Sequence, residues 1–342
     1  MANKAAWVTE KQAYPMKVGD APMPEPKENQ ITIRVRAVAI NPVDWVMQAA
    51  GALLEKYPSI TGCDAAGEVT SVGSAVTHFN VGDRVAGCVD HDGDALGQGT
   101  FQLYCNVIET LAGKIPDAVS FTDACVLPIG MCTACTGLFE KSTLGLPLPQ
   151  LQPKPNGKVL VVWGGSSSVG SCAIQAAKAA GFEVAATAGA HNLEFCKSIG
   201  ADYAFDYKSD TLVEDVVAAL KGKDSAGIFN AVMGEETYIK CAEIASQLGG
   251  TQIMSSVLPP SMPYEKPLPG GVKLAYNFCY ELKGTEVGPA IWHQWVPAAL
   301  ANGTLECKPE AYVVGQGLEK IQEAVDAWKN GASARKYVVE IP

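Results

Sequence analysis

The chain has 342 residues, of which 48% are hydrophobic and 18% charged, a composition that excludes a disordered or fibrous protein. This length exceeds that of one ordinary hydrophobic core, so two domains are expected. With 26 basic and 36 acidic residues the net charge is −10, which disfavours nucleic acid and anionic membranes as partners.

The cysteines do not form a disulfide pattern. Eleven of them are scattered through apolar segments, and an odd number cannot all pair. Disulfide frameworks also belong to small secreted chains. We therefore expect reduced, buried thiols, and because the N-terminal segment carries no apolar signal sequence, a cytoplasmic protein. The uncharged run 124–139 contains Pro128 and Gly130 and is too short to span a bilayer.

The first part of the chain is predicted to be a β domain. Up to about residue 120, short β-type runs at 30–39, 66–72, 84–89 and 101–108 are separated by glycine and proline. Few helical periods interrupt them, which indicates a twisted, largely antiparallel arrangement. The proline-rich segments 144–155 and 258–269 cannot be interior helix or strand. We interpret them as connecting loops, with loops that line a substrate cleft as the alternative.

From residue 158 onward, strands and helices alternate. The run 158–163 is continuously apolar, as in a strand buried on both faces of a parallel sheet. A Gly/Ser turn and an Ala-rich helix ending near Gly181 follow. Further strands are predicted at 183–188, 203–206, 227–232 and 250–256, with helices at 192–199, 212–220 and 236–248. This alternation predicts a doubly wound α/β sheet. After this region a helix is predicted at 318–330 and a strand at 336–341, which no longer follow the regular strand–helix alternation. We therefore expect the tail to fold back on the first domain.

The turn after strand 158–163 is a candidate phosphate site. A strand, a tight turn and a helix N-terminus bring backbone N–H groups and the helix dipole together. The dinucleotide fingerprint G-x-G-x-x-G is present as Gly165-x-Ser167-x-x-Gly170, with serine at the middle position. The alternative is a packing turn that binds nothing. The residues predicted to bind a pyrophosphate are Gly165, Ser166, Ser167, Ser168, Val169 and Gly170.

The end of the second strand of this region indicates the type of dinucleotide. Enzymes that use NAD place an acidic residue there. In this chain the strand ends in Thr187-Ala188-Gly189-Ala190-His191-Asn192, and no acidic residue occurs before Glu194. A 2′-phosphate would not be repelled, and His191, Asn192 and Lys197 could donate to it. NADPH is therefore the predicted cofactor, with an exposed, helix-capping His191 as the alternative.

Several short motifs are spread over nearly the whole chain. They are Ala39-Ile40-Asn41-Pro42-Val43-Asp44, Gly62-Cys63-Asp64-Ala65-Ala66-Gly67-Glu68-Val69, Val81-Gly82-Asp83-Arg84-Val85, the serine turn, Gly317-Leu318-Glu319-Lys320-Ile321 and Tyr337-Val338-Val339. In this order they resemble the medium-chain dehydrogenase/reductase superfamily. The Asn-Pro-x-Asp-Trp motif and Ala190-His191-Asn192 make the chain most similar to its zinc-free quinone oxidoreductase and enoyl reductase branch. Fungal trans-acting enoyl reductases and zinc-binding dehydrogenase-like proteins are the nearest groups.

The resemblance implies a division into two domains. A GroES-like β domain would comprise residues 1–125 and 290–342, and a Rossmann domain with a doubly wound parallel sheet would comprise residues 126–289, with the cofactor between them. Tyr207 would lie along the adenosine. The 2′-phosphate would meet Gly189, His191 and Asn192, and the nicotinamide would lie near Val43, Asp44 and Thr133. The family has a proline after the serine at the 2′-phosphate position, whereas this chain has Gly189-Ala190.

A metal is not expected. Zinc-using members of the superfamily carry Gly-His-Glu where this chain has Gly62-Cys63-Asp64. A Cys-Asp pair can bind zinc, but the four histidines lie outside the motif positions, and Cys132 matches a third ligand in only one of two alignments. The four closely spaced cysteines of a structural zinc lobe are also absent between residues 88 and 105. We interpret Cys132-x-x-Cys135 as buried helix cysteines rather than a redox motif, and His91-Asp92-Gly93-Asp94 as a solvated turn.

Without a metal to polarise a carbonyl, conjugate reduction of an activated C=C bond is favoured over alcohol dehydrogenation. Tyr57 follows the Asn-Pro-x-Asp segment much as an enoyl reductase tyrosine does, and is the candidate proton donor. A water, with Tyr57 only packing its loop, is the alternative. The predicted function is NADPH-dependent reduction of a small-molecule or carrier-bound enoyl or enone substrate, by a monomer or homodimer, in fungal secondary metabolism. Quinone reduction, NADPH binding as a synthase partner, and a non-redox reaction on the same fold are the alternatives.

Overall fold

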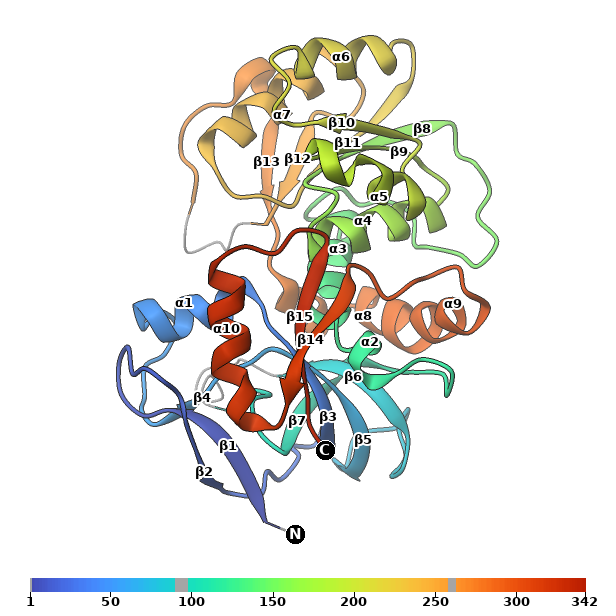
Figure 1. Cartoon of the computed structure of the whole chain (residues 1–342). Helices are drawn as coiled ribbons and strands as arrows, with labels where there is room; N and C mark the ends of the chain where they lie inside the picture. Colours follow the sequence, from blue (N-terminus) through green and yellow to red (C-terminus); the bar gives the residue numbers. More distant parts are fainter. Residues whose placement is uncertain (1, 90–97, 258–262) are drawn as a thin grey trace. The chain divides into compact units, whose positions relative to one another are not determined.

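The computed structural model describes residues 2–89, 98–257 and 263–342, and their contacts form two units (Figure 1). Unit 1 consists of the residues up to Ile129 together with Cys307–Pro342, and unit 2 consists of Gly130–Glu306. The boundaries expected from the resemblance were 125 and 290, whereas the contacts place residues 290–306 with unit 2.

Unit 1 is built mainly of antiparallel strands. Its elements are β1 (Asn3–Val8), β2 (Lys17–Ala21), β3 (Gln30–Ala39), α1 (Pro42–Ala50), β4 (Ser59–Ile60), β5 (Asp64–Val72), β6 (Arg84–Val89), β7 (Tyr104–Lys114), α2 (Phe121–Ala124), β14 (Glu310–Gln316), α10 (Ile321–Lys329) and β15 (Arg335–Glu340). One sheet has the order β14-β15-β3-β5-β6-β7, and a smaller sheet has the order β2-β1-β4.

Strand β3 is the centre of this unit, because it pairs antiparallel with β5, β7 and β15. Because β7 pairs with β3 as well as with β6, the strands β3, β5, β6 and β7 form a closed ring of paired strands. Alternate side chains of a strand point to one face, and Ile31, Ile33 and Val35 are fully buried in the core. The expected antiparallel β domain is therefore confirmed. The tail folds back on it, as expected, since β15 joins the sheet beside β3.

Unit 2 carries a parallel sheet with helices between the strands. Its elements are α3 (Pro128–Phe139, whose first residues belong to unit 1), β8 (Lys158–Trp163), α4 (Ser168–Ala179), β9 (Glu183–Ala188), α5 (Leu193–Ser198), β10 (Tyr203–Asp206), α6 (Leu212–Ala219), β11 (Asp224–Asn230), α7 (Glu235–Leu248), β12 (Ile253–Ser256), β13 (Lys273–Tyr276), α8 (Val287–Pro289), a π-helical turn (Ala290–Trp295) and α9 (Val296–Asn302).

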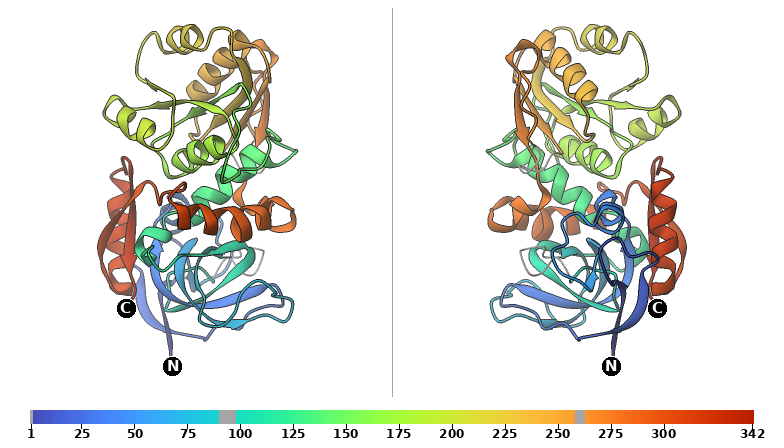
Figure 2. Two further views of the ribbon diagram at one scale, coloured as in Figure 1. Left: turned by 90° about the vertical axis from the view of Figure 1, so that its right-hand side faces the viewer. Right: turned by 90° about the vertical axis from the view of Figure 1, so that its left-hand side faces the viewer.

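The strand order of this sheet is β10-β9-β8-β11-β12-β13. Counted from β8 this is 3-2-1-4-5-6, the order of a doubly wound dinucleotide-binding sheet. Helices α4 and α5 cover one face and α6 and α7 the other, as Figure 2 shows. The expected Rossmann-type sheet is therefore confirmed, including the burial of strand 158–163, in which Val159 to Val162 are at most 1% exposed.

Two strands of this sheet start at other residues than predicted. β11 begins at Asp224 and not at Gly227. Gly227, with φ +104°, lies in an irregularity of the pairing with β8, and the strand is paired with β8 on both sides of it. β12 begins only at Ile253, since Gly249 and Gly250 have φ of +74° and +68° and form the turn after α7. Left-handed φ values suit glycine and interrupt regular strand pairing.

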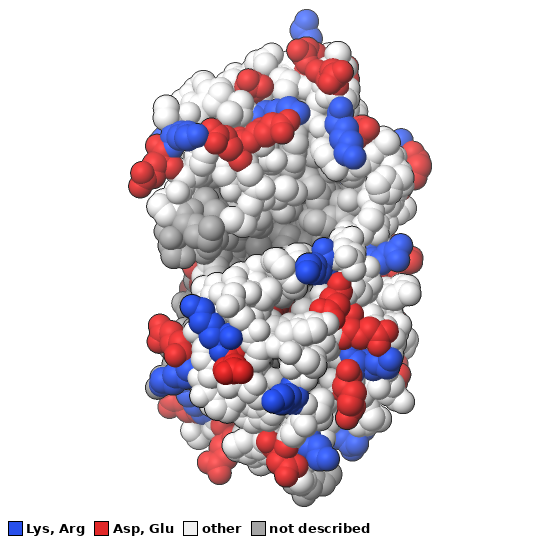
Figure 3. Space-filling model, turned by 60° about the vertical axis from the view of Figure 1, so that its left-hand side comes forward, with Lys and Arg blue, Asp and Glu red and all other residues white. Residues whose placement is uncertain are grey.

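The structure also shows where the cysteines and the apolar stretch around residues 124–139 lie. All eleven cysteines lie in described residues, none of them forms a disulfide bond, and ten are buried. Within the described residues, the stretch Phe121–Phe139 is long and apolar enough to cross a membrane by length and composition, but 72% of it is buried, as in a core helix. On the face seen in Figure 3, acidic and basic side chains are interspersed over each unit.

Candidate functional site

The predicted phosphate turn of unit 2 is a preformed helix N-terminus. It joins the carboxyl end of β8 to α4. Ser167 is the N-cap: its Oγ accepts from the N–H of Gly170 at 3.0 Å and donates to the carbonyl of Gly164 at 2.8 Å. The first-turn N–H groups of a helix have no intrahelical partner and attract anions. The turn lies where the strand order reverses between β8 and β11, the position at which open α/β sheets bind nucleotides.

The glycines of the fingerprint allow the turn to pack closely. A Cβ on Gly170 would overlap the carbonyl oxygen of Gly164. A Cβ on Gly165 would lie 2.9 Å from Ile174 and 3.0 Å from the Cβ of Ala186. Both positions therefore require glycine for the approach of α4 to the sheet, whereas Ser167 at the middle position is tolerated because its hydroxyl holds the turn.

The residues predicted for the 2′-phosphate and adenosine lie together at the ends of β9 and β10. A Cβ on Gly189 would be 3.1 Å from the His191 ring and 3.7 Å from the Tyr207 ring. Asn192 Nδ2 donates to Ser166 Oγ at 3.3 Å, which links this group to the serine turn. The Nζ of Lys197, the further predicted donor, forms an exposed pair with Glu194 at 2.9 Å.

Sequence reasoning missed a cation and several apolar residues at the same edge of the sheet. Lys208 Nζ lies 5.8 Å from the centre of the Tyr207 ring. Val232, Met233 and Phe278 follow β11 and β13 and are 38–49% exposed, so they leave apolar surface at the carboxyl ends of these strands. For Val232 and Met233, the position after the buried strand β11 was the signal that could have found them, whereas β13, which precedes Phe278, is only half-buried and was not predicted.

The predicted nicotinamide residue Thr133 lies on a face of α3 that packs against this edge. Gly130, Thr133 and Gly137 share that face by helical spacing. A Cβ on Gly130 would be 2.8 Å from Ser168 Oγ, and one on Gly137 would overlap Asn277. Asn277 Nδ2 donates to the carbonyl of Thr133 at 2.8 Å. Thr133 is therefore held beside the start of α4.

The two cysteines of Cys132-x-x-Cys135 belong to the buried part of α3. Trp292 Nε1 donates to Cys132 Sγ at 3.2 Å. Cys135 Sγ contacts Met131 Sδ at 3.5 Å, and burial raises the pKa of its thiol well above the usual value, with smaller contributions from Cys132 and Cys172. A thiol held neutral in the core is a poor nucleophile, which agrees with core cysteines.

Unit 1 contains a buried polar cluster around the predicted residue Asp44. Asp44 Oδ2 accepts from the N–H of Asn41 at 2.7 Å, and Asp44 Oδ1 accepts from Cys63 Sγ at 3.6 Å. Asp64 Oδ2 accepts from Asn41 Nδ2 at 2.9 Å and lies 3.2 Å from Lys336 Nζ. All five side chains are at most 4% exposed. Val43, which is half-buried, is next to this cluster on the first turn of α1.

Burial dominates the ionisation of the two acids. It raises the pKa of Asp44 to about 7; the negative charge of Asp64 adds to this shift, while the N–H of Asn41 and the charge of Lys336 oppose it. Burial also raises the pKa of Asp64, and Lys336 pulls it back. Asp44 therefore holds its proton to a higher pH than an ordinary aspartate does.

The donor groups of this cluster do not form a metal site. Among the residues that the structure describes, no three His, Cys, Asp or Glu side chains gather closely enough to hold a metal ion. Both oxygens of Asp64 are occupied, Oδ1 by the N–H of Ile129 at 2.8 Å and Oδ2 by Asn41 and Lys336. The segment His91-Asp92-Gly93-Asp94 lies outside the described residues.

The predicted catalytic residue Tyr57 lies at the other end of α1. Its hydroxyl is buried and has no hydrogen-bond partner among the described residues. A Cβ on Gly51, the C-cap of α1, would be 3.2 Å from that hydroxyl. Asp44 lies in the first turn of α1, roughly 10 Å away along an α-helix that rises about 1.5 Å per residue. The structure therefore does not bring Tyr57 and Asp44 together.

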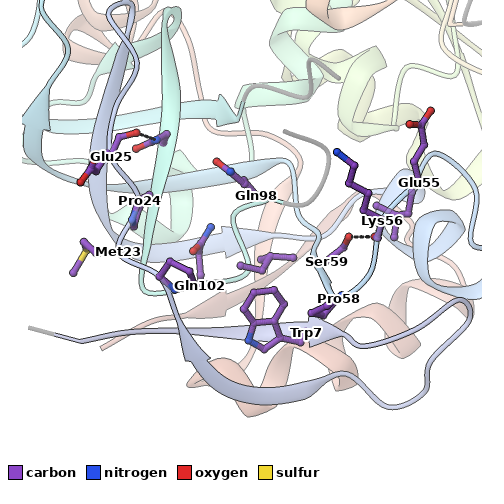
Figure 4. Close-up of a pocket in the computed structure, with 14 residues that line it drawn as sticks. Trp7, Met23, Pro24, Glu25, Glu55, Lys56, Pro58, Ser59, Gln98 and Gln102 are labelled. Atoms are coloured by element: carbon purple, nitrogen blue, oxygen red, sulfur yellow. Dashed lines mark hydrogen bonds between the residues drawn. The ribbon is translucent and has the colours of Figure 1, made fainter. Parts of the chain in front are cut away.

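A cavity of about 480 Å³ opens beside the loop that carries Tyr57 (Figure 4). Lys56, Pro58 and Ser59 line it, but Tyr57 does not. Two amides of its wall are held by the protein itself, since Asn106 Nδ2 donates to the carbonyl of Glu25 and Gln102 Nε2 to that of Gly99, each at 2.7 Å. None of the predicted cofactor residues lines this cavity.

Known proteins match the whole chain. Residues 27–117 match the alcohol dehydrogenase GroES-like domain, and residues 168–269 match the zinc-binding dehydrogenase family. The chain is 37% identical over 369 residues to Dehydrogenase pigH of Monascus ruber, covering 99% of both chains. It is 38% identical over 344 residues to Trans-enoyl reductase himH of Aspergillus japonicus, covering 100% of this chain and 98% of the relative.

A solved structure has the same fold. An alcohol dehydrogenase superfamily protein from Novosphingobium aromaticivorans superposes with a TM-score of 0.79 at 24% identity, covering 99% of this chain and 100% of that one. The identities to curated relatives over nearly full length, the two domain matches and the strand order agree. The chain belongs to the medium-chain dehydrogenase/reductase family of nicotinamide-dependent oxidoreductases.

Proposed function

We propose that the protein is an NADPH-dependent, zinc-independent enoyl reductase. The observation that carries this proposal is the end of β9, where His191, Asn192 and Lys208 offer hydrogen-bond donors or positive charge. Asp206, the residue of β10 opposite Ala188, already accepts from the N–H of Lys208 at 3.1 Å. Glu194, the first acidic residue after the strand, is paired with Lys197 at 2.9 Å. A 2′-phosphate would therefore meet no unpaired carboxylate from this segment.

The residues of unit 2 fit a dinucleotide phosphate. The first turn of α4, with Gly165, Ser166, Ser167, Ser168, Val169 and Gly170, would hold the pyrophosphate by backbone N–H groups. Gly189, His191, Asn192 and Lys208 would surround the 2′-phosphate, and Tyr207 would lie along the adenosine. The nicotinamide contacts that the family resemblance implies are Thr133, Val43 and Asp44. When bound, NADPH supplies the hydride for the reduction.

The bonding of the candidate zinc ligands supports zinc independence. A catalytic zinc takes three protein ligands in addition to an open position. Of the groups that the sequence offers for it, Asp64 is already bound by Asn41, Ile129 and the ammonium of Lys336, and Cys132 accepts from Trp292. A positive side chain in contact with Asp64 also opposes a second cation there.

Conjugate reduction fits a site without a Lewis acid. Hydride at the β-carbon of an activated C=C bond leaves an enolate, which needs hydrogen-bond donors and then a proton at the α-carbon. We propose Tyr57 as the source of that proton through a water, because its buried hydroxyl has no partner among the described residues, while Asp44 at the proposed nicotinamide contact lies roughly 10 Å away along α1. The fungal relative named a trans-enoyl reductase supports an enoyl substrate, as a small molecule or on a carrier.

The test is NADPH oxidation with an enoyl thioester, a small enone and a quinone, each with NADPH that carries deuterium at the transferred position. Label at the β-carbon of the thioester or enone is the expected result. Reduction of the quinone alone would replace the proposal with a quinone reductase. Tight NADPH binding without label in any product would replace it with a binding or non-redox role.

A further inference from the structure

The polar cluster of unit 1 contains a buried cation that the proposed cofactor contacts do not use. Lys336 is a residue of β15, and its side chain is 4% exposed. A buried ammonium is strongly disfavoured unless it is paired and hydrogen-bonded. Lys336 has such partners: its Nζ lies 3.2 Å from Asp64 Oδ2 and donates to Asn41 Oδ1.

We propose that Lys336 is a positioning residue for the first turn of α1. Its ammonium group fixes the side chain of Asn41, and Asn41 in turn fixes Asp44. The proposal rests on the proposed function only where it connects that turn, through Val43 and Asp44, with the nicotinamide.

Strand pairing explains how the lysine reaches this place. β15 runs antiparallel to β3, with Val338 opposite Ala39. The same register, continued from Val338 back to Lys336 and from Ala39 on to Asn41, places Lys336 opposite Asn41. Asn41 directly precedes α1 (Pro42–Ala50) as its N-cap. Strand β15 therefore places the ammonium group of Lys336 beside Asn41, the N-cap of α1.

Asn41 connects the cation with the helix through separate atoms. Its Oδ1 accepts from Lys336, its Nδ2 donates to Asp64 at 2.9 Å, and its backbone N–H donates to Asp44 Oδ2 at 2.7 Å. The last contact is the reciprocal bond of a capping box, in which the third helical residue reaches back to the N-cap. The side chain of Asn41 is oriented by the cluster, so its orientation depends on Lys336.

The lysine also balances the charge of two acids. Asp44 and Asp64 are both fully buried, and each raises the energy of the other in its ionised form. Removing one partner of a buried ion pair leaves an uncompensated charge. A loss of stability on mutation of Lys336 would therefore say little about positioning, and the experiment has to separate the two effects.

The experiment compares Lys336→Met with Lys336→Met/Asp64→Asn, which removes both charges of the pair. The control is Lys320→Met, since Lys320 forms a surface pair with Glu323 in the same unit. We measure hydrogen exchange of peptides that cover residues 41–50, the melting temperature, the dissociation constant of NADPH, and kcat for the enone or enoyl thioester that the wild type reduces.

We expect both Lys336 variants to exchange faster in the first turn of α1 and to lose at least about tenfold in kcat, because small displacements of reacting groups are costly. The dissociation constant of NADPH should change less than about threefold, since the pyrophosphate contacts lie in unit 2. The double variant should melt near the wild type while keeping the kinetic defect. The Lys320 variant should match the wild type in every measurement.

A double variant with wild-type exchange and wild-type kcat would overturn the proposal, because Lys336 would then only balance charge. If Lys336→Met does not fold, the double variant alone gives the same decision. If the wild type reduces none of the substrates, the proposed function fails, but exchange in residues 41–50 still tests the role of Lys336.

Discussion

Gly170 lies so close to Gly164 that a Cβ on Gly170 would overlap the Gly164 carbonyl oxygen. Replacing Gly170 with alanine should force α4 away from β8 and move the N–H groups that would hold the pyrophosphate. We expect Gly170→Ala to abolish NADPH binding in a fluorescence titration. Gly284→Ala is the matched control, because a Cβ on Gly284 would meet nothing within 4 Å. Wild-type affinity in a folded Gly170→Ala variant would contradict the proposed cradle.

The protein should prefer NADPH over NADH by at least about tenfold, since each charge-assisted hydrogen bond to the 2′-phosphate contributes about 1.5 to 3 kcal/mol. His191→Ala and Lys208→Ala should each weaken NADPH binding and leave NADH binding unchanged. Titration of each variant with both cofactors measures this. Equal affinities of the wild type for the two cofactors would exclude the proposed 2′-phosphate site.

The purified protein should contain no stoichiometric zinc and should keep its activity in the presence of chelators. The reason is that Asp64 is already saturated by hydrogen bonds and a lysine, and that the described residues offer no three-ligand group. Elemental analysis provides the measurement. One zinc per chain would favour alcohol dehydrogenation instead.

Replacing Tyr57 with phenylalanine should leave NADPH affinity intact and lower kcat by about 10² to 10⁴, the usual contribution of general acid catalysis. The readout is steady-state reduction of an enone together with the position of deuterium in the product. If Tyr57→Phe works at the wild-type rate with label at the β-carbon, the proton comes from water or another residue, and the reductase assignment stands without Tyr57.

The stability of unit 1 should depend on Asp44. Its pKa is about 7 in the folded protein, against 3.8 for an unperturbed aspartate side chain. Between these values the folded state holds a proton that the unfolded state has lost, so the free energy of unfolding should fall as pH rises, by up to about 1.4 kcal/mol per unit. Urea denaturation at pH 5 and 7.5 should show a smaller change for Asp44→Asn than for the wild type. Equal changes would refute the raised pKa.

Local patterns were enough to predict the order of strands and helices in unit 2 from β8 to β12, whereas β13, α8 and α9 were not predicted. The apolar run of β8, the serine turn and the repeated alternation each follow from a few neighbouring residues. The helix α1 was not predicted, because Pro42–Ala50 is short and its start depends on Asn41 and Asp44 bonding to each other and to the cluster. Strand β14 was missed as well, since its exposed Tyr312 and Val313 give no clear alternation.

For the candidate site, the sequence predicted residues but not their partners. Ser166 and Asn192 are both in the predicted set, yet only the structure shows that they bond to each other. Lys208 was overlooked because its neighbour Tyr207 comes close to Gly189 only where β10 lies beside β9. The contact between Asn41 and Lys336 spans 295 positions, a separation at which no local pattern carries information.

The discontinuous make-up of unit 1 has a consequence for synthesis on the ribosome. Unit 2 is contiguous and its segment can fold once residue 306 has emerged. Unit 1 must wait for the end of the chain, because β15 supplies a neighbour of β3. Until then the nascent chain presents an unpaired stretch of β3, a surface prone to association. A chain that terminates before residue 335 would keep that stretch open for good, so we expect C-terminal truncation to yield aggregates even though unit 2 is complete.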